Sequence, residues 1–456
     1  MKPKIFSSVS LAAVAISVAV LTGSLQGQWP NKQTRQERFT PRGEVANEGP
    51  ARIFFKSGNT AVADPSDGTE APTGFDNLTN GFIQQGPPFE SINEENVVPP
   101  RSMNDSRFVF EEVETVADGL GPTYNAQSCR ECHQNVVTGG ASQVAEHRTG
   151  RKFQEFFEAP GGSLIQSRAT NPEIVEHVAE EDNISTFRIS TNTLGDGFVE
   201  CIANSTLVAI RDGQPENMRG TALRVAVLEA HGSVRIGRFG WKSQHASLLS
   251  FAADAYLNEM GITNPLFPEE NTSGGVFVGY GTQYDPVRDP EDHDSIDIKA
   301  FARFIRATKA PSRGPITNDV IAGEEHFNAV GCAICHVSSM MTVRPGTVIN
   351  GGEFIVPHAL GNKIIHPFSD FLLHNIGTGD GIPFLPTPEF ENTARQIKTA
   401  PLWALRTRNR LMHDGLSSTK EEAIRRHTNQ AADVKRRFNA LTRSERDQIM
   451  AFLDSL

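Results

Sequence analysis

The sequence predicts a mostly α-helical fold of two domains with long loops, and three observations lead to this prediction. Apolar residues recur at helical spacing in several segments, whereas few stretches alternate polar and apolar residues as half-buried strands do. A linker rich in Pro, Gly and Ser separates two of the helical segments. The 456 residues are enough for two or even three domains, each with its own hydrophobic core.

The N-terminus has the pattern of a secretory signal peptide. Residues 1–27 contain two lysines, no acidic residue, an apolar run over residues 9–21 and small residues around Gly23. The apolar run is shorter than an ordinary membrane span, and no cysteine follows it that could carry a lipid anchor. We therefore expect a periplasmic protein whose mature chain has no membrane span.

The first predicted domain covers residues 76–310. The polar residues 28–75 before it are rich in Gly, Pro, Asn and Thr, which predicts an extended or disordered leader. Apolar residues on one face predict a helix over residues 247–261. The Gly-rich, acidic residues 268–297 predict a long loop, and a further helix is expected over residues 298–308.

The second predicted domain covers residues 316–456. The stretch APSRGP at residues 310–315 is the clearest linker in the chain. Asn318 can cap a helix that begins just after this linker. The chain is expected to end in an amphipathic helix, whose apolar stripe consists of Ile449, Phe452, Leu453 and Leu456.

Two short motifs contain four of the five cysteines. Residues 128–133 read SCRECH and residues 331–336 read GCAICH, so Cys-x-x-Cys-His occurs twice. This pattern is the signature of c-type haem attachment, in which two thiols form thioethers to haem vinyl groups and the histidine ligates the iron. The residues that would hold two haems, with the histidines as axial ligands, are Cys129, Cys132, His133, Cys332, Cys335 and His336.

Zinc sites and redox-active cysteine pairs are the alternatives to haem. Zinc would need two further ligands near each pair, and neither half of the chain contains a second Cys-x-x-Cys. A thioredoxin-like site would need a βαβ context, which the sequence does not predict. The fifth cysteine, Cys201, is expected to be a buried free thiol.

With these motifs the chain resembles the bacterial di-haem cytochrome c peroxidase and MauG-type superfamily, most closely its di-haem oxidoreductase branch. The resemblance implies two cytochrome c-like haem domains, in which the N-terminal haem is the peroxide site and the C-terminal haem relays electrons. The segments that carry it read GLGPTYNAQSCRECHQNVVTGG, RIGRFGWKSQHASLLSFAADAYLNEMGITNP, TAPLWAL, LMHDGLSSTKEEAIRRH and FNALTRSERDQIMAFLDSL.

The resemblance also implies roles for individual residues. His427 would be the second iron ligand of the C-terminal haem, with Met412 as the alternative ligand. Glu259 would be the acid/base at the N-terminal haem, where Gln244 would position peroxide or water. Trp241 would lie between the haems as an electron relay. For each of these side chains an ordinary place on the surface or in the core is the alternative.

One departure from the superfamily concerns calcium. Other members have Thr-x-Pro before His-Asp-Gly, which helps to bind an interdomain calcium, but this chain has Arg408, Asn409 and Arg410 there. An interdomain calcium is therefore doubtful. The two arginines could instead face haem propionates or a substrate carboxylate.

Three functions are compatible with the sequence. The first is a peroxidase, or a MauG-like enzyme that oxidises another protein or small molecule. The second is an electron-transfer cytochrome, and the third is an oxygenase. A formal charge of -11 argues against nucleic acid as a partner and would suit a small basic electron donor, such as a cytochrome c or cupredoxin. In the second case the first iron would need another ligand, for which the candidates are His147, His177, His231 and His245.

Overall fold

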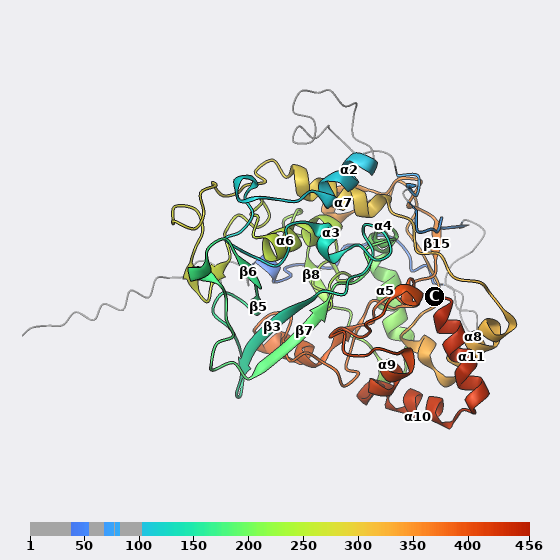
Figure 1. The fold of residues 1–456 in the computed structure, drawn as a ribbon. Coiled ribbons are helices and arrows are strands. Elements are labelled where there is room, and N and C mark those ends of the chain that lie inside the picture. Colours follow the sequence, from blue (N-terminus) through green and yellow to red (C-terminus); the bar gives the residue numbers. More distant parts are fainter. Residues whose placement is uncertain (1–37, 54–67, 77, 83–102) are drawn as a thin grey trace, which may run out of the picture.

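A computed structural model describes residues 38–53, 68–76, 78–82 and 103–456 of the chain. The expected signal peptide lies outside these residues. The described part is helix-rich, with long loops and many short strands between the helices (Figure 1). Its α-helices are α2 (Met103–Glu111), α3 (Cys129–Cys132), α4 (Asp196–Glu200), α5 (Asn204–Gly213), α6 (Leu248–Met260), α7 (Ile296–Ala307), α8 (Asn318–Val330), α9 (Lys420–Arg426), α10 (Ala432–Ala440) and α11 (Arg443–Asp454).

The predicted long helices are present, and local hydrogen bonds define their ends. In α6 the Ser247 hydroxyl accepts a hydrogen bond from the Ser250 N–H, and Gly261 ends the helix at φ 73°. The helix expected after the linker is present, but Asn318 is its first residue and not its cap. The cap is Thr317, whose hydroxyl accepts a hydrogen bond from the Val320 N–H. The apolar stripe predicted for the C-terminal helix is buried in α11 and at the C-terminus that follows it.

The sequence pattern does not predict most of the strands, because most are two or three residues long and the longest is polar. The longest, β3 (Ala145–Lys152), reads AEHRTGRK and pairs with β7 (Ile184–Ile189) along six residues. A strand without apolar alternation gives no period-two signal. The remaining strands are β1 (Thr69–Glu70), β2 (Thr123–Tyr124), β4 (Phe156–Glu158), β5 (Leu164–Ile165), β6 (Arg168–Ala169), β8 (Arg224–Ala226), β9 (Val234–Ile236), β10 (Thr272–Ser273), β11 (Val276–Phe277), β12 (Met340–Met341), β13 (Val348–Ile349), β14 (Phe354–Ile355), β15 (Lys363–Ile365), β16 (Leu373–His374) and β17 (Ile397–Lys398).

The described parts of the expected leader pack against the rest of the protein. Val45 pairs in parallel with Val234, and β1 pairs with β15. Glu48 is buried and forms an ion pair with Arg235, with 2.5 Å between Glu48 Oε1 and Arg235 Nε. These parts are extended, which is one of the two states expected for the leader. Their buried contacts exclude the other state, disorder.

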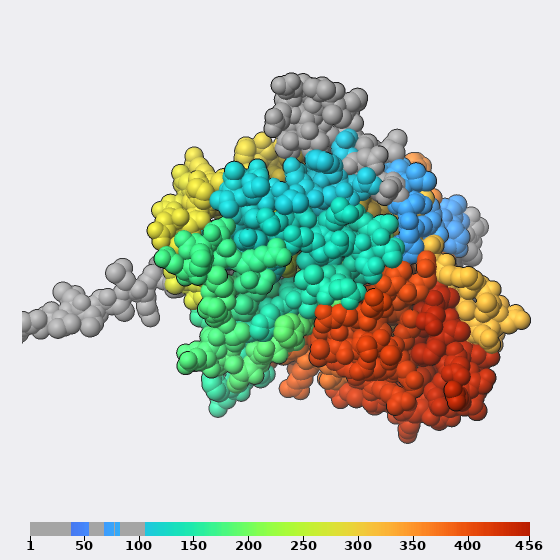
Figure 2. All heavy atoms as spheres, in the orientation of Figure 1, coloured from blue at the N-terminus to red at the C-terminus, as the bar shows by residue number. Residues whose placement is uncertain are grey.

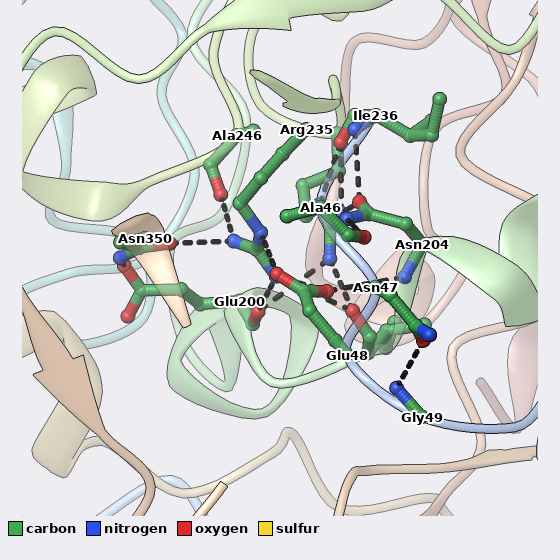
Figure 3. Close-up of polar contacts among 12 residues, drawn as sticks. Ala46, Asn47, Glu48, Gly49, Glu200, Asn204, Arg235, Ile236, Ala246 and Asn350 are labelled. Atoms are coloured by element: carbon green, nitrogen blue, oxygen red, sulfur yellow. Dashed lines mark hydrogen bonds and ion pairs between the residues drawn. The ribbon is translucent and has the colours of Figure 1, made fainter. Parts of the chain in front are cut away.

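Arg235 joins three parts of the chain that are distant in sequence (Figure 3). Its guanidinium donates to the Glu48 carboxylate, to the Glu200 backbone carbonyl at 2.9 Å and to the Asn350 side chain at 2.7 Å. The side chain is 0% exposed, so every one of these bonds forms away from water. Buried charges need such complete partnering to offset their lost hydration.

Two hydrophobic clusters form most of the core. The larger one combines residues from before the 310–315 linker with residues 337–403 that follow it. The smaller one lies within the C-terminal part, where α8 and α11 pack against each other, and includes Val320, Phe327, Phe438, Ile449 and Phe452. The atoms of the chain after about residue 400 gather on one side of the molecule (Figure 2). The chain therefore crosses between the two clusters after the linker.

No helix among the described residues is both long and apolar enough to cross a membrane.

Candidate functional site

The first Cys-x-x-Cys-His motif borders a cavity of about 1100 Å³, counting the part open to solvent. We call it the Cys129 cavity. It contains the first motif and every residue that the resemblance assigns to the peroxide site. The side chains that matter here are Cys129, Cys132, His133, Glu146, Arg148, Trp241, Gln244 and Glu259.

The second motif borders a larger cavity of about 1300 Å³, which we call the Cys332 cavity. Both candidate second ligands of the C-terminal haem, His427 and Met412, line it opposite a mostly apolar wall. The rings of His336 and His427 are close enough for each charge to disfavour the other.

Three histidines that could ligate iron have the same hydrogen-bond arrangement. The Nδ1 atoms of His133, His336 and His427 lie 3.2, 3.0 and 2.8 Å from the backbone carbonyls of residues 140, 368 and 423. Because a carbonyl only accepts, Nδ1 carries the proton and Nε2 keeps its lone pair. A fixed Nδ1–H is the usual support of a metal-bound histidine.

The same three imidazoles are neutral at pH 7. Burial lowers the pKa of His133 and of His427. Burial together with the nearby His427 lowers the pKa of His336 to about 4. A neutral imidazole has the lone pair that a metal needs, so these rings are ready to ligate without losing a proton.

Glu259 lies at the end of α6 and lines the Cys129 cavity. Burial and the adjacent Glu146 carboxylate raise its pKa well above the usual value, and the two side chains are hydrogen-bonded to each other. The Asn125 amide donates to Glu259 Oε2 at 2.9 Å. Two adjacent carboxyl groups that share one proton are a typical acid/base arrangement.

No sequence motif points to Glu146 and Arg148, which complete this arrangement from β3. Burial alone would raise the pKa of Glu146, but the Arg148 guanidinium lowers it below the usual value. Arg148 donates to both carboxylate oxygens, at 2.8 and 3.1 Å. The residues are two apart on one strand and so point to the same face. The run of polar residues in β3 is the sequence feature that could have indicated these two residues.

His133 is the one histidine among the described residues that line the Cys129 cavity. Gln244 lines it, and its Oε1 accepts a hydrogen bond from the Lys242 N–H at 3.1 Å. None of the four histidines proposed to close the first iron is among the described residues that line the cavity; these are His147, His177, His231 and His245. Met260 does line it and is the remaining candidate ligand.

Trp241 lines both cavities. Its indole N–H donates to the Ile189 carbonyl at 2.8 Å, and its own carbonyl accepts from the Lys398 N–H. The next residue, Lys242, forms a buried ion pair of 2.7 Å with Asp380, which also pairs with Arg188. These bonds hold the indole in the wall between the two cavities.

Basic side chains line the otherwise apolar Cys332 cavity; they are Lys398, Arg408, Lys420 and Lys435. Burial lowers the pKa of Arg408 to about 10, so its guanidinium is still charged at pH 7. Haem combines an apolar ring with two carboxylates, which matches this combination of surfaces. Arg410 instead donates to the backbone carbonyls of Gly415 and Gln143 and does not face the cavity.

The structure gives little support to zinc. Cys335, Asp370 and His374 lie close enough to hold a metal ion, but no comparable group among the described residues includes Cys129 or Cys132. His374 is committed to Asp370, 2.8 Å away. Burial lowers the pKa of His374, but the Asp370 carboxylate outweighs it and raises the pKa to about 10. The group also has only three members, whereas a structural zinc site takes four ligands. Cys201 is a buried free thiol, as expected.

A family model described as "Di-haem oxidoreductase, putative peroxidase" matches residues 157–456, about two thirds of the chain. The chain belongs to this di-haem oxidoreductase family. Membership implies two haems, and the two cavities provide the space and neutral histidines for them. The first Cys-x-x-Cys-His motif precedes the matched residues, so its assignment rests on the motif and its cavity.

Solved structures resemble this di-haem oxidoreductase only distantly. A MauG-like protein associated with microbial copper homeostasis is 16% identical, with a TM-score of 0.25; the match covers 36% of this chain and about half (54%) of that protein. Hydrazine synthase from Kuenenia stuttgartiensis is 14% identical, with a TM-score of 0.35, and the match covers 90% of this chain and 100% of that one. Neither likeness supports a conclusion about activity. No curated protein matches the chain.

Proposed function

We propose that this di-haem oxidoreductase is an exported c-type peroxidase, which reduces hydrogen peroxide in the Cys129 cavity. The observation that carries the proposal is the hydrogen-bonded pair Glu146 and Glu259 in the cavity that His133 lines. A protonated carboxyl beside an ionised carboxylate can give a proton to one peroxide oxygen and take a proton from the other.

Both haems are proposed to be attached through thioethers, one to Cys129 and Cys132 and the other to Cys332 and Cys335. His133 and His336 are the proposed axial ligands, and His427 is the proposed second ligand on the His336 side. Haem bound in these places supplies the storage and transfer of single electrons.

The side chains of the Cys129 cavity handle the protons. Each peroxide takes up two electrons and two protons to yield two waters. Glu259 donates a proton to the departing oxygen, and Glu146, held by Arg148, keeps Glu259 protonated through its negative charge. Gln244 has an amide N–H₂ group that can orient the bound peroxide.

Trp241 is the proposed electron relay between the two cavities. Its ring lines both of them, and a conjugated ring shortens the gap that an electron must cross. The alternative role, core packing, involves only a small cluster that contains Ile189 and Ile397. Electrons would enter on the His336 side from a small basic donor, cytochrome c or cupredoxin, which the acidic chain attracts. Export to the periplasm would provide such a donor.

The test is an optical and EPR spectrum of the haem-loaded protein, oxidised and half-reduced, before and after one equivalent of hydrogen peroxide. A high-spin signal that peroxide consumes, together with peroxide reduction by a reduced cytochrome c, supports the proposal. Two low-spin signals that peroxide leaves unchanged in both states would refute it and favour an electron-transfer cytochrome. Met260→Leu would then show whether Met260 closes the first iron.

Replacing Glu146 is expected to change the pH dependence of peroxide reduction. The Glu146 charge raises the pKa of Glu259, so Glu146→Gln lowers that pKa. Activity that needs protonated Glu259 is present below its pKa and falls as the pH rises through it. The alkaline limb of the pH–kcat profile should therefore move to lower pH in Glu146→Gln. An unmoved limb would show that Glu259 is not the titrating acid.

Replacing His427 should open the C-terminal iron. We expect His427→Ala to convert the EPR signal of that haem from low-spin to high-spin, because the second axial ligand is removed. Met412→Leu is the matched control, since Met412 lines the same cavity, and it should leave the signal low-spin. The opposite pair of results would assign the ligand to Met412.

A further inference from the structure

The long loop between α6 and α7 contains a cluster of four carboxylates that the proposed peroxidase chemistry does not use. One oxygen from each lies within 4.8 Å of the others. The four residues are Glu270, Asp285, Asp289 and Glu291.

Asp285 shows that the cluster is more than an acidic surface. Its side chain is 5% exposed, although a lone carboxylate normally stays in water. Oδ1 accepts a hydrogen bond from the Val287 N–H at 3.0 Å, while Oδ2 is buried and has no hydrogen-bond partner. A buried carboxylate oxygen without a donor is costly, unless a cation binds it.

Three carboxylates of the cluster have no charged partner in the described part of the chain. Among the described residues, no lysine, arginine or histidine forms an ion pair with Asp285, Asp289 or Glu291.

We propose that this cluster binds a calcium ion, with Glu270, Asp285, Asp289 and Glu291 as its carboxylate ligands. Calcium takes six to eight oxygens at about 2.3–2.6 Å, so two ligand oxygens on opposite sides are about 4.8 Å apart. One oxygen from each of the four carboxylates could therefore reach the same ion. The all-oxygen set excludes soft metals as the preferred ion, and magnesium favours a smaller octahedral shell that keeps several waters.

The proposed ion would connect the loop to the part of the chain that carries the acid/base pair. The Thr263 hydroxyl donates to Asp289 Oδ1 at 3.0 Å, and the Thr263 N–H donates to Glu291 Oε2 at 2.7 Å. Thr263 is four residues after Glu259, just beyond the end of α6. This place differs from the interdomain calcium of the superfamily, which would lie near Arg408.

The test measures Ca²⁺ binding to the haem-loaded full chain by isothermal titration calorimetry, and the thermal midpoint with Ca²⁺ or with EGTA. We expect one Ca²⁺ per chain, a lower midpoint in EGTA and much weaker binding of Mg²⁺. Asp285→Asn should weaken Ca²⁺ binding by roughly tenfold or more, because it removes a charged ligand. In EGTA it should be at least as stable as the wild type, because it also removes repulsion.

Asp294→Asn is the matched control, because Asp294 lies in the same loop but is exposed and paired with His293. It should bind Ca²⁺ as the wild type does. Equal Ca²⁺ affinity in the wild type and Asp285→Asn, or no Ca²⁺ binding by the wild type, would overturn the proposal. A lower midpoint of Asp285→Asn in EGTA as well as in Ca²⁺ would overturn it too, because it would indicate a purely structural side chain. These readouts do not depend on peroxidase activity.

Discussion

Glu259→Gln is expected to lower kcat for peroxide reduction by about 10²- to 10⁴-fold, the usual contribution of a positioned acid or base. The amide keeps the shape of the side chain and its contact with Asn125, but it cannot donate a carboxyl proton. Steady-state peroxide consumption with a reduced cytochrome c measures the effect. Because the change removes a proton donor and not a binding contact, KM should change much less than kcat.

The control for this prediction is Glu155→Gln, since Glu155 is exposed and lies away from the Cys129 cavity. Haem content and the optical spectrum should be the same for both variants and the wild type. A Glu259→Gln protein with normal spectra and normal kcat would contradict the acid/base role. In that case Glu146 would have to be tested as the acid.

Arg235→Met is expected to destabilise the protein by about 3–5 kcal/mol. The substitution leaves the Glu48 carboxylate buried without its main partner, and it removes the bonds to Glu200 and Asn350. The loss should appear as a lower thermal midpoint and a lower guanidinium midpoint of the haem-loaded protein. Both midpoints report on the same change if unfolding is cooperative.

Two further variants show how much of the stability loss in Arg235→Met comes from the unpaired buried charge and how much from lost packing. Arg211→Met removes an ion pair with Asp212 whose side chains are 34% and 58% exposed, and it should cost less than about 1 kcal/mol. The double variant Glu48→Gln/Arg235→Met should regain part of the stability, because no unpaired charge remains. If Arg235→Met were as mild as Arg211→Met, the buried pair would not be important for stability.

Local sequence signals predicted four helices, which correspond to α6, α7, α8 and α11. Helix α6 has apolar residues at helical spacing, a serine cap and a terminal glycine, all within a short segment. The Cys-x-x-Cys-His motifs are equally local. The structure brings Glu259, Gln244 and Trp241 to the first motif, and His427 to the second. Their roles remain proposals, and the variants of Glu259 and His427 above test two of them.

The missed features depend on contacts between distant segments. Glu146 and Arg148 belong to a strand that is polar because one of its faces lines a cavity, and only its pairing with β7 reveals it. The packing of residues 38–53 depends on Glu48 meeting Arg235, 187 positions later. Composition alone predicts an extended or disordered segment here, because its few apolar residues do not recur at helical or strand spacing.

Residues 337–403 pack into the larger hydrophobic cluster together with residues from before the linker. The protein therefore cannot be cut at the linker without exposing that cluster. A fragment that ends at the 310–315 linker would lack part of its own interior, and the fragment after the linker would expose the apolar surface that fills it. The two haem cavities therefore share a single folding equilibrium. Anything that occupies one of them also stabilises the walls of the other.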